Sequence, residues 1–272
     1  MRLSGFHLPV EHLSASSIAQ FMTCPEAFRL ERIAKIPKRR FLDGFIGSVH
    51  HDTIEENFRQ KIETGNDQTY EQAEGVYKYK WHEELEKGEP QWTEHPERVE
   101  ELGLKMLKTF HTAVAPTIKP IAVEQRFEER VPGLPLPVVG YIDVEEERLI
   151  DEFKTSKQAV KSPKPNWRFQ GLIYQLFSRK PIYWTITTKQ KTPVNWTWQT
   201  APNLILPIQN PDNTVRMMTQ AVEMLNDYWL RYGPTRPWPT TGVMHTWACD
   251  YCSGGPKNPN PACVVWKDNS AN

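Results

Sequence analysis

Two carboxylates and a lysine are the residues of this sequence best placed to do chemistry together. In the segment that ends at Thr155, the alternation of an extended strand puts Glu152 and Lys154 on one face. The preceding segment carries Asp143, and a short turn would pair the two segments antiparallel, so that Asp143 approaches Glu152. Two adjacent carboxylates repel each other unless a cation neutralises them, and oxygen ligands favour Mg²⁺ or Mn²⁺. The lysine could then orient a water molecule or stabilise developing charge.

Further polar residues lie on both sides of this group. Gln170 and Tyr174 are four positions apart and therefore share one face of a predicted helix. Upstream, His50 and His51 stand in another helical segment, and either imidazole could ligate a metal. For each of these residues alone, an ordinary structural role is the commoner explanation, so the hypothesis depends on the combination.

Four cysteines form a second candidate site. Cys249 and Cys252 make a C-x-x-C pair, Cys263 follows after ten intervening residues, and Cys24 lies near the start of the chain. Four thiolates satisfy Zn²⁺ or a [4Fe–4S] cluster equally well. Disulfides are less expected, because the sequence shows neither a secretory signal nor a membrane span, and a cytoplasmic location keeps thiols reduced.

Hydrophobic spacing predicts the elements that position these residues. A helical period fits 13–34 with a break at Pro25, 44–62, 69–110 with a break at 88–96, 166–178 and 212–232. A period of two predicts strands over 121–130, 137–145, 148–155, 182–188 and 193–199. The order of helices, meander, helix, hairpin and helix indicates an α/β fold with a mixed central sheet flanked by helices.

Composition and charge narrow the class of protein. The chain has 272 residues, of which 39% are hydrophobic and 24% charged, so disordered and coiled-coil classes are excluded. Its net charge is zero, yet the stretch between Phe153 and Pro211 holds nine basic residues and no acidic one, whereas 143–152 holds six acidic residues. Acid beside base suggests a metal site that faces a polyanion, although a solvated basic face is the usual alternative. Phosphate-loop, zinc-peptidase, serine-hydrolase and dinucleotide-binding motifs are absent from the sequence.

The order and spacing of the motifs resemble the RecB-like branch of the PD-(D/E)XK nuclease superfamily. The motifs are Gly47-Ser-Val-His-His51-Asp-Thr-Ile-Glu55, Gly140-Tyr-Ile-Asp143, Glu152-Phe-Lys154 and Gln170-Gly-Leu-Ile-Tyr174. This resemblance implies a restriction-endonuclease-like core with a helical insertion. It implies that the metal ligands are His51, Asp143, Glu152 and the carbonyl of Phe153. It also implies that Lys154 is the catalytic lysine and that Gln170 and Tyr174 act in the DNA cleft.

The cysteines carry a second resemblance. An early cysteine followed by proline, with three more near the C-terminus, is similar to the iron–sulfur subset of these nucleases. That subset includes CRISPR-adaptation exonucleases and the nuclease domains of bacterial helicase–nuclease complexes. It implies a [4Fe–4S] cluster, with Zn²⁺ as the alternative, which clips the chain ends together through Cys24, Cys249, Cys252 and Cys263. The interval from Cys252 to Cys263 is longer than is typical of the subset.

These resemblances predict a metal-dependent deoxyribonuclease, expected to be an exonuclease that acts on DNA ends or single strands. The expected setting is recombination, repair or CRISPR adaptation, with recombination, helicase or CRISPR-adaptation proteins as partners and no membrane. The residues expected to contact the DNA backbone are Lys157, Lys161, Lys164 and Arg168. Aromatic residues in the same stretch, Trp167 among them, could stack on bases, although most are expected to fill the core.

Two alternatives come from other functional classes. One is a non-catalytic DNA-binding or assembly subunit with an iron–sulfur or zinc site, and the other is a zinc-binding structural protein. The convergent carboxylates and the lysine argue for an enzyme instead. The expected organisation is a single nuclease domain, composed of an N-terminal helical arm (1–45), a helical lobe (46–120), a nuclease core (121–232) and a cysteine-rich tail (233–272).

Overall fold

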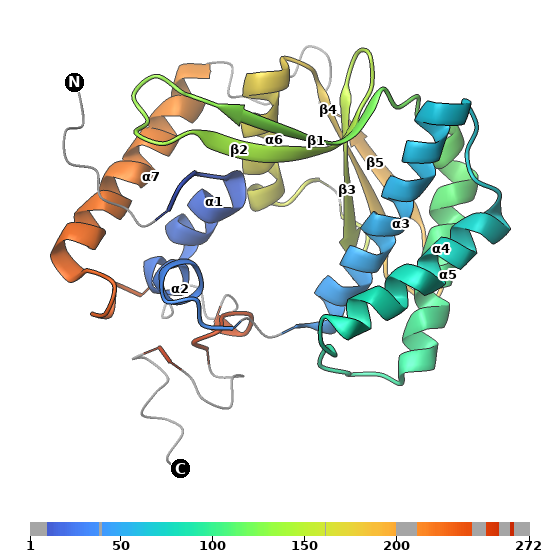
Figure 1. Ribbon diagram of the computed structural model, residues 1–272, viewed down its shortest axis with the longest axis horizontal. Coiled ribbons are helices and arrows are strands. Elements are labelled where there is room, and N and C mark those ends of the chain that lie inside the picture. Colours follow the sequence, from blue (N-terminus) through green and yellow to red (C-terminus); the bar gives the residue numbers. More distant parts are fainter. Residues whose placement is uncertain are drawn as a thin grey trace. The chain divides into compact units, whose positions relative to one another are not determined.

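A computed structural model describes residues 10–37, 40–160, 162–199, 211–240, 249–255 and 262–263 (Figure 1). The chain divides into two compact units. The terminal unit comprises Met1–Arg39, Phe127–Gly140 and Ile208–Asn272, and the central unit comprises Arg40–Arg126 and Tyr141–Pro207. All residues of the predicted metal and catalytic group fall within the central unit, whereas all four cysteines fall within the terminal unit.

A five-stranded mixed sheet has the strand order β1-β2-β3-β4-β5. Its strands are β1 (Ala122–Glu129), β2 (Val138–Glu145), β3 (Ile150–Ser156), β4 (Ile182–Thr188) and β5 (Asn195–Gln199). The pairing is antiparallel between β2 and β3, parallel between β3 and β4, and antiparallel between β4 and β5. This sheet and its flanking helices confirm the predicted α/β fold with a mixed central sheet.

Helices of the central unit cover both faces of β3 and β4. They are α3 (Leu42–Thr64), α4 (Tyr70–Glu86), α5 (Pro96–Ala113), the short 3-10 helix η2 (Ala115–Thr117) and α6 (Pro165–Ser178). On one face, the ring of Phe153 lies 5.8 Å from that of Phe58 in α3 and 5.2 Å from that of Phe110 in α5. Contacts of this kind contribute about 0.5–1.5 kcal/mol each beyond area burial. Figure 1 shows α3, α4 and α5 packed together.

The opposite face of β3 and β4 packs against α6. A Cβ atom at Gly171 would lie only 2.3 Å from the indole of Trp184, so the absence of a side chain at Gly171 lets α6 approach β4 closely. The strand register pairs Trp184 with Glu152. Because paired residues project to the same side of a sheet, Glu152 also faces α6.

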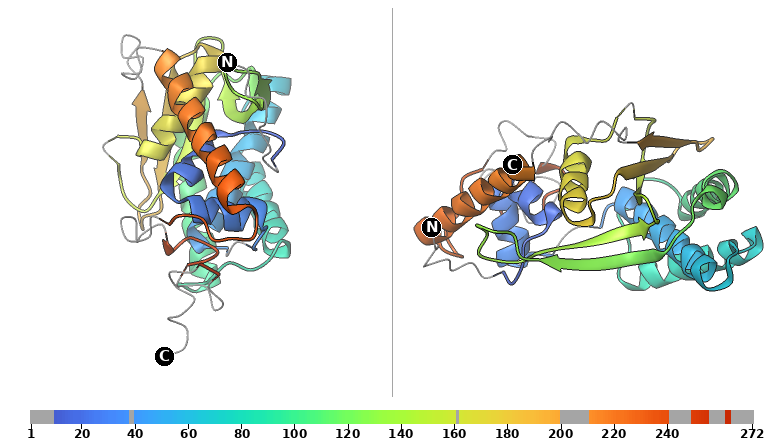
Figure 2. Two further views of the ribbon diagram at one scale, coloured as in Figure 1. Left: turned by 90° about the vertical axis from the view of Figure 1, so that its left-hand side faces the viewer. Right: turned by 90° about the horizontal axis from the view of Figure 1, so that it is seen from above.

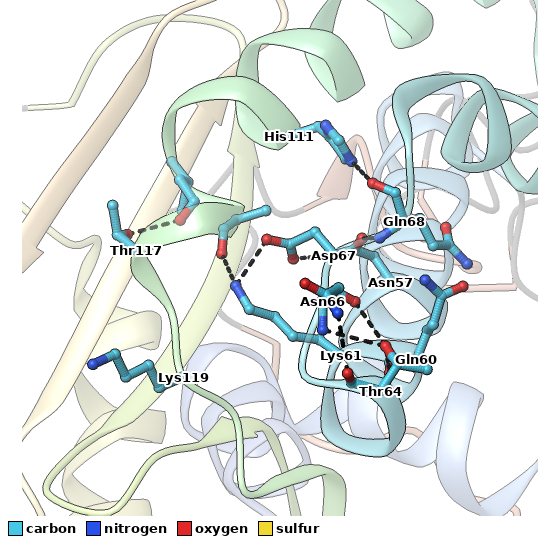
Figure 3. Close-up of polar contacts among 12 residues, drawn as sticks. Asn57, Gln60, Lys61, Thr64, Asn66, Asp67, Gln68, His111, Thr117 and Lys119 are labelled. Atoms are coloured by element: carbon cyan, nitrogen blue, oxygen red, sulfur yellow. Dashed lines mark hydrogen bonds and ion pairs between the residues drawn. The ribbon is translucent and has the colours of Figure 1, made fainter.

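Polar contacts anchor the C-terminal end of α3 (Figure 3). Lys61 forms an ion pair with Asp67 at 2.8 Å and donates a hydrogen bond to the carbonyl oxygen of Ala115 at 2.7 Å. Asn57 donates to Asp67 and accepts from the backbone N–H of Gln68, both at 2.8 Å. These bonds join α3 to the segment before α4 and to η2, and so hold in place the helix that carries His50 and His51.

The terminal unit is built on α1 (Ala15–Thr23), α2 (Pro25–Phe28), the π-helical turn η1 (Arg29–Ile33) and α7 (Pro211–Tyr232). Pro25 opens α2 at the first helical position, where a missing N–H is tolerated, so Cys24 becomes the extended junction between two helices. The helix α7 lies across α1 (Figure 2, left), and the ring centroids of Phe21 and Tyr228 are 5.7 Å apart.

The predicted helices and strands are present within the described residues. The helix expected over 13–34 breaks at Pro25 as predicted, and the segment expected over 69–110 divides into α4 and α5 at the predicted break. No helix in the described part of the chain is long and apolar enough to cross a membrane.

Candidate metal centre and active site

The candidate site lies where β2 parts from β3. The two strands pair at Val144 with Asp151 and at Glu145 with Ile150. Asp143 immediately precedes Val144 in β2, and its Oδ2 accepts a hydrogen bond from the backbone N–H of Phe153 at 2.7 Å. This carboxylate oxygen accepts the hydrogen bond that a backbone carbonyl of a neighbouring strand would otherwise accept. Because the N–H and C=O of one extended residue point to the same edge, the carbonyl of Phe153 lies on the Asp143 side as well.

Three ligand atoms converge at this point. Those of His51, Glu124 and Asp143 all lie within 4.8 Å of one another. His51 Nε2 is 3.1 Å from Asp143 Oδ1 and 3.5 Å from Glu124 Oε1. A second compact group, which shares His51, includes Asp52 and Glu55. One imidazole nitrogen and two carboxylates form a donor set suited to Mg²⁺ or Mn²⁺.

Glu124 was not among the residues predicted from the sequence. It lies in β1 with a φ of +49°, a backbone conformation that is uncommon for residues other than glycine and that recurs at functional sites. Burial and the nearby Asp143 raise the pKa of Glu124 to about 7. The only signal in the sequence is an acidic residue near the start of a predicted strand, which many surface strands also show.

Glu152 and Lys154 form the second part of the site. Glu152 is fully buried, and its Oε2 accepts a hydrogen bond from Lys154 Nζ at 2.8 Å. The other carboxylate oxygen, Oε1, has no partner among the described residues, and Glu152 belongs to neither compact ligand group found there. Burial and Asp143 raise the pKa of Glu152, while Lys154 opposes this rise. A buried carboxylate oxygen without a partner costs about 1–3 kcal/mol or more, and a cation would relieve that cost.

Lys154 keeps its charge in this environment. Burial by itself lowers the pKa of Lys154, but the carboxylates of Glu152 and Asp143 outweigh burial and raise it. For Asp143, burial is likewise outweighed by His51 and Lys154, which lower its pKa. The site therefore pairs an ammonium group with carboxylates inside the protein, where such interactions are strong.

The two neighbouring histidines have different environments. His50 is buried, its ring lies 5.8 Å from that of Phe110, and its nitrogens have no hydrogen-bond partner among the described residues. Burial, then His51 and Lys189, lower the pKa of His50 to about 3, so its ring is neutral. Burial alone would also lower the pKa of His51, but Asp143 and the other carboxylate of the group raise it to about 9. The structure thus brings His51 to the carboxylates, as the resemblance implies, while ligation by His51 stays a prediction.

Gln170 and Tyr174 share one face of α6, as their spacing predicts. The side-chain amide of Gln170 donates a hydrogen bond to the hydroxyl oxygen of Tyr174 at 2.9 Å. Tyr174 is buried, and burial together with Glu152 raises its pKa. The α6 pair therefore stands beside the Glu152 and Lys154 pair, although its part in a reaction stays a prediction.

The predicted DNA-contacting residues have different surroundings. Lys157 follows β3 with a side chain that is 72% exposed. Lys164 places its ammonium 4.9 Å from the ring centroid of Trp167, and Arg168 is exposed in the first turn of α6. Lys161 lies outside the described residues.

Part of the basic charge is neutralised locally. Lys180 pairs with Glu145 at 2.6 Å, and Lys157 and Lys189 both pair with Asp43, at 3.0 and 3.1 Å. Basic residues that are separated from acidic residues in the sequence therefore form ion pairs with some of them in the fold. The basic stretch supplies fewer unpaired cations than its composition indicates.

All four cysteines belong to the terminal unit, and none of them forms a disulfide. The backbone N–H of Gly254 donates to Cys252 Sγ at 3.4 Å, and that of Cys263 donates to the carbonyl of Gly254 at 3.2 Å. Burial raises the pKa of Cys252 to about 12, and the thiols of Cys24 and Cys263 lie near enough to add to the rise. A bound cation would offset the repulsion that these neighbouring groups would feel as thiolates, so the cluster fits a thiolate-binding cation, whose identity and presence stay predictions.

Hydrogen bonds join the two chain ends without any metal. Glu26 is 1% exposed and binds Arg29 Nη2 at 2.7 Å and Nε at 2.8 Å, and it also accepts from the backbone N–H of Trp238 at 2.7 Å. Glu31 accepts from the N–H and the hydroxyl of Ser253 at 3.1 and 3.2 Å. The predicted cysteine clip would therefore reinforce contacts that already connect these segments.

This chain is similar to known nucleases in sequence and in fold. The model of the PD-(D/E)XK nuclease superfamily matches residues 12–254. The solved structure named "Putative exonuclease", from Eubacterium rectale, aligns with a TM-score of 0.55 at 13% identity and covers 84% of this chain and 87% of that chain. At this identity the likeness shows a shared fold.

Two other comparisons add less. The crystal structure of SSO0001 aligns with a TM-score of 0.35 at 14% identity over 89% of this chain and 94% of that chain, a score too low to support a shared fold. Among curated proteins, none matches the sequence closely enough to be called a relative.

Proposed function

This chain belongs to the PD-(D/E)XK nuclease superfamily, and we propose that it is a metal-dependent deoxyribonuclease with its reaction centre between β2, β3 and α3. The observation that carries the proposal is the convergence of His51, Glu124 and Asp143 beside the ion pair of Lys154 with the buried Glu152. A histidine, carboxylates and a lysine held together at this point can bind a metal ion and stabilise the charge that develops in phosphodiester hydrolysis.

The donor set fits a hard divalent cation. We propose that His51, Glu124 and Asp143 hold Mg²⁺ or Mn²⁺ together with Glu152 and the carbonyl of Phe153. The orphaned Glu152 Oε1 supports this assignment, because a cation would satisfy it. Such a cation, when bound, polarises a phosphoryl oxygen and makes water a better nucleophile.

The protein's own groups supply orientation and charge. Lys154 is fixed by Glu152 and carries a permanent positive charge, so it can hold the attacking water or stabilise the negative charge that develops on the phosphate. Tyr174, oriented by Gln170, presents a protonated hydroxyl beside this pair and can donate a hydrogen bond to the substrate.

DNA ends or single strands are the proposed substrates. The structural neighbour from Eubacterium rectale, which is named as an exonuclease, supports an exonuclease over an endonuclease. For the terminal unit we propose a structural [4Fe–4S] cluster on the four cysteines, with Zn²⁺ as the alternative. DNA processing in recombination, repair or CRISPR adaptation, with partners from those processes, is the corresponding biological role.

Lys154→Ala tests the proposed reaction centre. We expect this change to lower the cleavage of end-labelled DNA in Mg²⁺ or Mn²⁺ by at least about 100-fold, as does removal of a preorganised charge-stabilising donor, while DNA binding is retained. Lys180→Ala is the matched control, because Lys180 is also an ion-paired lysine of the central unit but pairs with Glu145.

Three results are informative here. Retained turnover in Lys154→Ala would contradict the role of this lysine. An equal loss in Lys180→Ala would indicate a general electrostatic effect rather than catalysis. A wild-type protein that binds DNA and never cleaves it would favour the alternative of an assembly subunit.

A further inference from the structure

A cleft of about 400 Å³ extends from the reaction centre within the central unit. His51 and Lys154 line one part of it, and Asp43, Gly44 and Trp167 line another. Its volume is in the range of ligand pockets. Because the same cleft contains the catalytic lysine, whatever occupies the part near Trp167 must be continuous with the substrate or compete with it.

We propose that this part of the cleft holds one unpaired nucleotide next to the scissile phosphate, with its base stacked on Trp167 and its phosphate bound by Lys157. The inference rests on the proposed function and deepens it by assigning the residues that would select an unpaired strand over a duplex. We call these residues the nucleotide subsite, defined as Asp43, Gly44, Lys157, Lys164 and Trp167.

Trp167 has the position and surroundings of a stacking platform. It is the third residue of α6, half-buried, and its ring lines the cleft. The ammonium of Lys164 lies 4.9 Å from the ring centroid, which places a positive charge beside the ring in a cation–π contact. An aromatic ring beside basic side chains is the combination with which proteins bind single strands without base specificity.

The charges beside Trp167 are arranged to accept a phosphate. Asp43 lies between two ammonium groups, those of Lys157 and Lys189. Lys189 is 7% exposed and also donates to the hydroxyl of Thr155 at 3.3 Å, so it is the structural partner of Asp43. Lys157 is the exposed partner, and it can turn towards a phosphate while Asp43 stays paired with Lys189.

Gly44 leaves open space at one side of the subsite, because it has no side chain. A Cβ atom at Gly44 would meet no atom within 4 Å, so a larger side chain there would project into open space beside the cleft. By contrast, a Cβ atom at Gly47 would lie 3.3 Å from the hydroxyl of Thr155, so no comparable space exists one turn along α3. Gly44 therefore offers a position at which the subsite can be filled without altering any charged group.

Stacking on Trp167 favours a single strand over a duplex. A base in a duplex must leave its stacked neighbours and its pairing partner before it can stack on a protein ring, which costs a few kcal/mol. A base in a single strand has no pairing partner to leave, so this cost is smaller. The subsite therefore predicts faster cleavage of single-stranded DNA, or of frayed ends, than of an intact duplex.

The test compares Trp167→Ala, Trp167→Phe and Gly44→Leu with wild type on a labelled single strand and on the matching duplex in Mn²⁺. We expect Trp167→Ala and Gly44→Leu to lower kcat/KM on the single strand by about tenfold, the effect of one lost stacking platform, with a smaller loss on the duplex. Trp167→Phe should retain most of the activity. Tyr79→Ala is the matched control, since Tyr79 is an exposed aromatic residue of the same unit with the ammonium of Lys80 5.8 Å from its ring centroid.

A second readout does not depend on turnover. In the Lys154→Ala background, a 2-aminopurine base placed in the single strand should be quenched on binding, and Trp167→Ala should remove the quenching. If wild type cleaves DNA but Trp167→Ala lowers both substrates equally and leaves the quenching unchanged, the subsite is refuted and the nuclease stands. If wild type cleaves neither substrate, the proposed function fails and the subsite fails with it.

Discussion

The two candidate sites of this protein are built in different ways. The group in the central unit is assembled from regular elements, because α3, β1, β2, β3 and α6 each contribute one or two side chains. The cysteines of the terminal unit lie on a junction between two helices and on a segment after α7. What holds that segment is a pair of hydrogen bonds, one to the buried Glu26 and one to the partly buried Glu31, rather than a strand register.

The side chains of the two sites are held in position by different kinds of interaction. The period of two and the sheet register place Glu152 and Lys154 before any metal is bound. In the terminal unit, the carboxylate of Glu26 binds both Arg29 and the backbone of Trp238, 212 positions away in the sequence. We therefore expect changes in the terminal unit to act mainly on stability and changes in the central unit to act mainly on chemistry.

The largest expected effect on stability comes from Glu26→Gln. This change leaves the guanidinium of Arg29 buried without its counter-charge, and we expect it to lower the free energy of unfolding by about 3–5 kcal/mol. Denaturant unfolding measures the loss. In a second variant, Glu26→Gln combined with Arg29→Met, much of the stability should return, because neither charge is then left unpaired. A single variant as stable as wild type would show that the pair does not hold the chain ends together.

A smaller effect, and one confined to the central unit, is expected from Glu124→Gln. The amide keeps the shape of the side chain but removes its charge from the group with His51 and Asp143. We expect the affinity for Mn²⁺, measured by calorimetric titration, to fall by about 10- to 100-fold, while unfolding changes little. Glu128→Gln, further along β1, serves as control. Unchanged Mn²⁺ binding in Glu124→Gln would remove this residue from the ligand set.

The smallest effect on DNA cleavage is expected from Cys252→Ser. The proposed cluster is structural, so anaerobically purified Cys252→Ser should lose its iron and visible absorbance while still cleaving DNA. Hydrogen bonds to Glu26 and Glu31 would continue to join the chain ends. A colourless wild-type protein that contains zinc would replace the iron–sulfur assignment, and loss of cleavage in parallel with loss of iron would contradict a purely structural role.

Local patterns predicted much of the fold and part of the candidate site. Alternation and helical spacing are local rules, and they brought Glu152 next to Lys154 and Gln170 next to Tyr174. Glu124 escaped prediction, because its positive φ breaks the alternation on which strand faces are assigned, and no sequence rule signals that break at a glutamate. Alternation alone therefore does not place Glu124 beside His51 and Asp143.

Long-range pairing escaped prediction for a different reason. Asp43 forms ion pairs with Lys157 and Lys189, which lie more than one hundred residues away in the sequence. Part of the positive charge of the basic stretch is therefore neutralised. Periodicity assigns a residue to a face of its own element, but it does not say which distant element will lie opposite. The nucleotide subsite is visible only once these partners are placed.

The most direct test of the central claim is the cation dependence of DNA cleavage by the wild-type protein. Protein freed of metal with EDTA is incubated with end-labelled single-stranded DNA, before and after Mg²⁺ or Mn²⁺ is restored. The arrangement of His51, Glu124, Asp143, Glu152 and Lys154 predicts no cleavage without the cation and progressive loss of DNA once it is restored. Cleavage that persists in EDTA, or DNA that stays intact in Mg²⁺ and in Mn²⁺, would contradict it.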